Sequence, residues 1–195
     1  MAEPLSEPTT EVAVLRRQSK KAWTSLEEAV RDVTADQANW WPPGTANSIG
    51  AIYLHVVINA DVEINRLIHR REPLLESRWG GEVGQGAAYD PDRYDRWVRH
   101  AAVDWDVLRD YGRAVHGALV ESLDELTDEQ LNDQVDMTRA GLGMWEGRDL
   151  FELHGSNHVL LHAGEIACLK GLQGGVGWAE SDAFRAAVIV EDLRE

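Results

Sequence analysis

Apolar residues recur every three to four positions along four long stretches of this chain, and this repeat constrains the fold more than any other feature. The stretches cover residues 10–33, 48–71, 93–123 and 146–172. A period near 3.6 residues is that of one face of an α-helix, and no part of the chain shows the strict alternation of a half-buried strand. Amphipathic helices of this length bury their apolar faces against one another. The sequence therefore predicts an all-α fold, a four-helix bundle.

Proline and glycine mark the connections between the predicted helices. The sequence Pro-Pro-Gly at 42–44 ends the first helix, and a glycine-rich stretch at 80–86 separates the second from the third. Segment 127–144 mixes turn residues and predicts a long connection with one short helix at 128–133.

The chain has the length of one domain. Residues 1–11 are polar, which predicts a flexible leader. They lack the basic and apolar regions of a signal peptide. We expect residues 12–195 to form the bundle and a C-terminal tail. The sequence does not indicate where the apolar segment 183–190 of this tail packs. No apolar run reaches the length of a membrane span.

Charge and cysteine content exclude several classes of function. The net charge is -15 and no basic cluster offsets it, which disfavours binding to nucleic acid. The single cysteine, Cys168, excludes an intrachain disulfide and a cysteine-based zinc site, and it fits a reducing cytoplasm. We expect Cys168 to be a buried, inert thiol.

Three of the seven histidines, His154, His158 and His162, follow one another at intervals of four residues. Residues four apart are neighbours on a helix face, so two imidazoles one turn apart can share one metal ion. The spacing predicts a divalent-metal site with His158 and His162 as ligands. Each step of four residues shifts a side chain by about 40° round the helix, so three successive histidines cannot all point at one ion. We therefore expect His154 to lie just outside the ligands or at the rim of the pocket. The H-E-x-x-H motif of zinc proteases is absent.

His55 is the candidate for the third ligand, because it interrupts the apolar run 49–60 on another helix. A buried imidazole needs partners for both nitrogens, and a metal ion with one hydrogen bond satisfies both. A hydrogen-bonded core histidine is the alternative interpretation. Asn59 and Asn157 are weaker candidates for side chains that face the interior.

Glu165 lies three residues after His162 and close to the same face. It could orient a ligand histidine or act as a general base, and a purely structural hydrogen bond is equally consistent. His69, His100 and His116 have no matching partners in the sequence, and we expect them to be solvated.

Several short motifs resemble the DinB-like superfamily, whose members usually have a histidine on the second helix and an H-x-x-x-H-x-G-Q-I stretch on the fourth. The likeness covers about residues 12–175. The matching segments are 36–42 (DQANWWP), 45–55 (TANSIGAIYLH), 123–131 (LDELTDEQL) and 158–166 (HVLLHAGEI).

The resemblance implies a bundle of DinB-like type with a long crossover before the last helix, and a zinc or nickel ion held by His55, His158 and His162. The superfamily includes thiol S-transferases that use mycothiol or bacillithiol and the mycothiol-dependent maleylpyruvate isomerases. Many members are dimers, so a homodimer is expected. Ala163 replaces a common basic residue and Glu165 replaces a common glutamine, which leaves the substrate open.

Three neutral histidine ligands leave coordination positions open, as in catalytic metal sites. The resemblance favours a thiol as the nucleophile, so we expect a metal-dependent S-transferase that joins a low-molecular-weight thiol to a small electrophilic substrate. Trp40, Trp41 and Trp145 are candidate pocket walls. A metal-dependent hydrolase of a small ester or amide is one alternative. The other is a non-enzymatic, dimeric metal-binding bundle, which a sealed site or a fourth ligand from Glu165 would favour.

Overall fold

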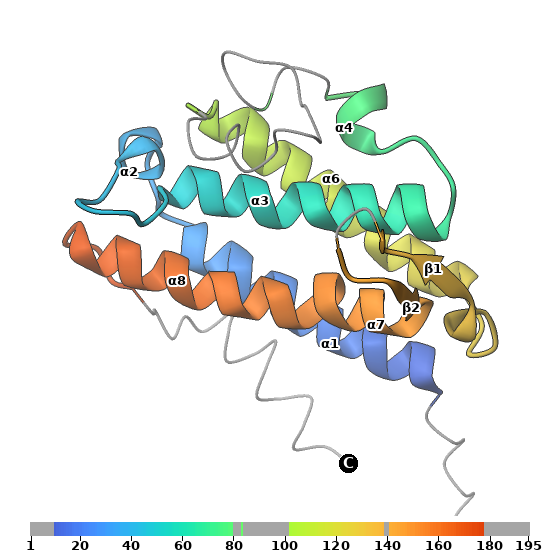
Figure 1. The fold of residues 1–195 in the computed structure, drawn as a ribbon. Helices are drawn as coiled ribbons and strands as arrows, with labels where there is room; N and C mark the ends of the chain where they lie inside the picture. The colour runs from blue at the N-terminus through green and yellow to red at the C-terminus, as the bar shows by residue number, and fades with distance from the viewer. Residues whose placement is uncertain (1–9, 80–82, 84–101, 139–140, 178–195) are drawn as a thin grey trace, which may run out of the picture.

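The computed structural model describes residues 10–79, 83, 102–138 and 141–177, and its long helices form a bundle (Figure 1). Helix α8 packs against α1 and α3, and α6 packs against the same two helices. The predicted all-α four-helix bundle is confirmed. The four helices are α1 (Glu11–Val30), α3 (Ile49–Asp61), α6 (Trp105–Glu125) and α8 (His158–Leu172).

Side chains just before the helices cap the first backbone amides, which fixes where each helix begins. Thr10 accepts a hydrogen bond from the third residue of α1, Ser48 from the third residue of α3, and Asp104 from the third residue of α6. The buried faces then meet in one apolar core that includes Trp23 and Tyr53. In the described part of the chain, no helix combines the length and apolarity needed to cross a membrane.

Two of the long helices contain a π-helical turn, a wider turn that periodicity in the sequence did not predict. Helix α3 continues as the π-helix η1 (Val62–Ile68). Helix α7 (Gly147–Glu152) leads through the π-helix η5 (Leu153–Asn157) into α8. The predicted helical stretches 48–71 and 146–172 are therefore largely present, each with a local change of helical register.

The third helix begins later than predicted. Residues 93–101 lie outside the described residues, and Ala102 to Asp104 are not helical, so α6 starts at Trp105. The reason is a pair of hydrogen bonds from Asn39, whose side chain accepts from the backbone N–H of Val103 at 2.9 Å and donates to its carbonyl at 3.1 Å. Because both the N–H and the carbonyl of Val103 bond to Asn39, they are not available for the hydrogen bonds of a helical turn.

The connection before the last helix contains a hairpin that the sequence did not predict. Strands β1 (Gln134–Asp136) and β2 (Met144–Glu146) pair antiparallel, with Val135 opposite Trp145. Strands of three residues are too short to show an alternating pattern. The predicted short helix at 128–133 is a 3₁₀ turn, η3 (Gln130–Asn132). The described residues also contain the short helices α2 (Ala35–Asn39) and α4 (Leu74–Ser77).

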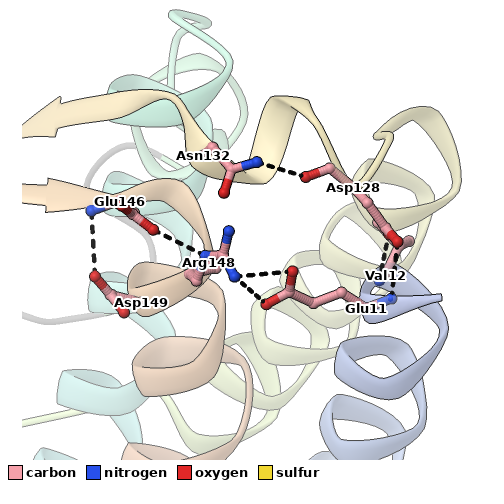
Figure 2. Close-up of polar contacts among 7 residues, drawn as sticks. All are labelled: Glu11, Val12, Asp128, Asn132, Glu146, Arg148 and Asp149. Carbon is pink, nitrogen blue, oxygen red and sulfur yellow. Dashed lines mark hydrogen bonds and ion pairs between the residues drawn. The ribbon is translucent and has the colours of Figure 1, made fainter.

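A polar cluster fastens this connection to the start of α1 (Figure 2). The carboxylate of Asp128 accepts hydrogen bonds from the backbone N–H groups of Glu11 at 3.1 Å and Val12 at 3.0 Å. Arg148, at the start of α7, contacts both carboxylate oxygens of Glu11 at 2.8 and 3.0 Å, and its Nε lies 2.9 Å from the carboxylate of Glu146. Asp128 thus caps a helix more than 100 residues away in the sequence.

Replacing Asp128 with alanine is expected to lower the free energy of unfolding by about 1 kcal/mol, the usual loss on removing a helix cap. For a domain of this size the melting temperature should fall by about 2–4 °C. Thermal unfolding followed by circular dichroism measures this. Asp133→Ala, in the same connection and exposed, is the control. Equal melting temperatures for the two variants would show that the cap does not stabilise the fold.

Candidate metal centre

Three histidines from two adjacent helices converge at one point between α3 and α8. His55 lies on α3, and His158 and His162 lie one turn apart on α8. The Nε2 atom of His158 is 3.0 Å from that of His55 and 3.0 Å from that of His162. One nitrogen from each ring lies within 4.8 Å of the others, so the three could hold a metal ion.

Hydrogen bonding alone does not account for this arrangement. An imidazole nitrogen carries either one hydrogen or one lone pair, so Nε2 of His158 can form one good hydrogen bond but not two. It nevertheless faces two other nitrogens at 3.0 Å. Two nitrogens bound tetrahedrally to one zinc ion at 2.0–2.1 Å lie about 3.3 Å apart. The donor set therefore fits a divalent cation.

The environment keeps His158 neutral, which is the state that binds metal ions. Burial, together with the neighbouring rings of His55, His154 and His162, lowers the pKa of His158 to about 3. Nδ1 of His158 is buried and has no hydrogen-bond partner within the described residues.

The other two rings have polar neighbours. Nδ1 of His162 lies 2.8 Å from a carboxylate oxygen of Glu165. Since a carboxylate only accepts, Nδ1 carries the hydrogen, and Nε2 is left with its lone pair toward the other histidines. The amide nitrogen of Asn59 lies 3.5 Å from Nε2 of His55. Glu165 is thus placed to orient a ligand histidine.

A family model described as the DinB superfamily matches residues 18–166, which is most of the chain. The chain belongs to the DinB superfamily. This confirms the resemblance seen in the sequence motifs. The matched region includes His55, His158 and His162, the three residues that could hold a metal ion.

Among solved structures, this DinB-superfamily chain is similar to the crystal structure of a conserved protein from Enterococcus faecalis. The TM-score is 0.66 at 18% sequence identity, and the match covers 88% of this chain and 98% of that chain. At this identity the likeness shows a shared fold. No curated protein matches the chain.

His154 lies beside the triad and is not a rim residue. The residue is 5% exposed, and its Nε2 contacts the carboxylate of Glu63 of η1. Its ring packs edge-on against that of His158, with centroids 5.3 Å apart. Sequence analysis missed Glu63, although Glu63 follows His55 by two helical turns and is thus placed near the same face.

Several other predictions were wrong. Cys168 is exposed rather than buried, because it lies on the outer face of α8. His69 is half-buried and contacts Ser122. His116 is half-buried and stacks on Trp23, with centroids 5.2 Å apart.

The predicted pocket residues separate in the structure. Asn59 is half-buried beside His55, as predicted, whereas Asn157 is exposed. Trp145 lines an open pocket with Asn157 and three residues of α7 and η5, namely Asp149, Glu152 and Leu153. His100 and segment 183–190 lie outside the described residues.

Proposed function

We propose that this DinB-superfamily protein binds a divalent metal ion, zinc or nickel, and uses it to transfer a low-molecular-weight thiol to a small electrophilic substrate. The convergence of the Nε2 atoms of His55, His158 and His162 carries the proposal. A divalent cation held by three neutral imidazoles keeps open coordination positions and lowers the pKa of a thiol or water molecule beside it.

Two features of the site favour an enzyme over a sealed metal-binding bundle. The three histidines are only partly buried, so part of their surface is open to solvent. The carboxylate of Glu165 engages Nδ1 of His162, on the opposite side of the ring from the converging Nε2 atoms. In this arrangement Glu165 orients a ligand and does not itself complete the coordination sphere.

Thiol transfer tests the proposal directly. The protein is purified without a nickel column and loaded with one equivalent of Zn²⁺ or Ni²⁺. It is then assayed with mycothiol or bacillithiol and chlorodinitrobenzene. We expect turnover in the wild type, none after chelation and none in His55→Ala, with His69→Ala as the unaffected control. A metal-loaded protein that transfers neither thiol would contradict the S-transferase assignment, and ester hydrolysis without thiol would favour the hydrolase.

Glu165 offers a second test, because its two possible roles respond differently to a conservative substitution. Glutamine keeps a carbonyl oxygen that accepts from Nδ1 of His162, whereas alanine does not. We expect Glu165→Ala to weaken metal binding by about 10-fold or more, and Glu165→Gln to keep most metal affinity and turnover. Chelator competition and the thiol-transfer assay measure the two quantities. A Glu165→Gln protein that binds metal normally but is inactive would instead identify Glu165 as the general base.

A further inference from the structure

Two buried nitrogens without partners lie on adjacent rings next to the triad. They are Nδ1 of His154 and Nδ1 of His158, and neither has a hydrogen bond to any described residue. The two rings touch, with centroids 5.3 Å apart and planes inclined at 72°. Since buried polar atoms are nearly always hydrogen-bonded, directly or through an ordered water, two such atoms on touching rings call for a common explanation.

The contact with Glu63 indicates which hydrogen-bonding role His154 takes when its ring is neutral. The carboxylate of Glu63 contacts Nε2 of His154, and the side chains are 18% and 6% exposed, respectively. A carboxylate only accepts, so Nε2 of His154 carries a hydrogen. In the neutral ring, Nδ1 of His154 then holds a lone pair and is an acceptor.

His158 needs the complementary role. To present the lone pair of Nε2 to a metal ion, its neutral ring must carry the hydrogen on Nδ1. That hydrogen requires an acceptor, and Glu165 is already engaged by His162. The acceptor nitrogen of His154, one turn earlier, belongs to the ring that contacts His158 edge-on.

The backbone supports the same pairing. Glu63 lies in η1 and His154 in η5, the π-helical turns that follow α3 and precede α8. The N–H of His158 donates to the carbonyl of Leu153, five residues back instead of four, so the wider turn sets the angle between His154 and His158. Turns of this kind are rare and are frequent at functional sites.

We infer that Glu63 and His154 form a positioning pair, in which Nδ1 of His154 accepts a hydrogen bond from Nδ1 of His158, directly or through one water molecule. The pair holds His158 in the tautomer that directs its Nε2 lone pair toward the metal ion. This inference rests on the metal binding proposed above. Glu63 and His154 act through His158 and make no contact with the ion themselves.

His154→Phe is the most direct test, because phenylalanine keeps an aromatic ring and removes the acceptor. Its matched control is His116→Phe. His116 is a half-buried histidine stacked on Trp23, and its own Nε2 is likewise buried without a partner in the described residues. We expect His154→Phe to weaken Zn²⁺ binding by about 10–100-fold in chelator competition, and His116→Phe to leave it unchanged. Glu63→Ala should also weaken Zn²⁺ binding, and it replaces His154→Phe as the test if that variant fails to fold.

The tautomer of His158 provides a readout that packing alone would not change. In the metal-free wild type, ¹⁵N chemical shifts should show the hydrogen of His158 on Nδ1, and His154→Phe should give a mixture of tautomers. Unchanged affinity would overturn the inference, and so would a loss of affinity with an unchanged tautomer. A wild type that binds no Zn²⁺ would instead refute the proposed function, while the tautomer measurement would still decide the role of the pair.

Discussion

Replacing His158 with alanine should abolish stoichiometric metal binding. Nε2 of His158 is the central atom of the triad, 3.0 Å from the Nε2 atoms of both His55 and His162. Four-ligand zinc sites bind with about 10–16 kcal/mol, or roughly 3 kcal/mol per ligand, so the loss of one ligand should weaken binding at least about 100-fold. The metal-free variant should remain folded, because the removed side chain is only partly buried.

Elemental analysis and thermal unfolding with and without Zn²⁺ together measure this effect. About one ion per chain is expected in the wild type and none in His158→Ala, with His69→Ala as the control. Added Zn²⁺ should stabilise the wild type by about 2.7 kcal/mol at 100 times its dissociation constant, and it should leave His158→Ala unchanged. A wild type that takes up neither Zn²⁺ nor Ni²⁺ would reduce the triad to a polar cluster in the core.

Replacing Asp61 with leucine should cause the largest loss of stability among the substitutions considered. Asp61, the last residue of α3, is completely buried. Its carboxylate accepts hydrogen bonds from the Tyr111 hydroxyl at 2.6 Å, the Asn65 amide at 2.7 Å, and the backbone N–H groups of Leu75 at 2.8 Å and Leu74 at 2.9 Å. One carboxylate thus joins α3, the start of α4 and α6.

Leucine has a similar volume but removes the acceptor that those four donors share. Hydrogen bonds to a charged group contribute about 1.5–3 kcal/mol each, so the total loss should be at least about 3 kcal/mol. The melting temperature should then fall by about 6–12 °C. Urea unfolding of Asp61→Leu beside Asp110→Leu, an exposed aspartate on α6, measures the difference. Equal stabilities would show that the carboxylate contributes nothing to the fold.

The sequence predicted the helices because their apolar faces repeat, and it predicted the triad because two ligands share one helix face. His158 and His162 are set by local spacing, whereas His55 was found only because it interrupts an apolar run. The late start of α6 depends on Asn39, which lies 64 residues from the backbone that it binds. No local pattern reports such a contact.

Glu63 and His154 show a different limit. Their contact depends on the π-helical turns η1 and η5, and one extra residue in a turn leaves no periodic signature. Cys168 was misplaced for another reason. Helix α8 carries apolar residues on all its sides, so periodicity does not reveal which face is exposed. Leu160 and Leu161 of this helix are exposed too.

The exposed thiol of Cys168 has a practical consequence for enzymology. Cys168 lies six residues beyond His162 on the same helix, roughly 9 Å along its axis, and it is the only cysteine of the chain. An electrophilic assay reagent can arylate it once per chain, which would produce a stoichiometric burst that resembles a first turnover. Kinetic work therefore belongs in a Cys168→Ser background. In the wild-type chain, the same residue offers a unique attachment point for a fluorescent or paramagnetic reporter of events at the histidines.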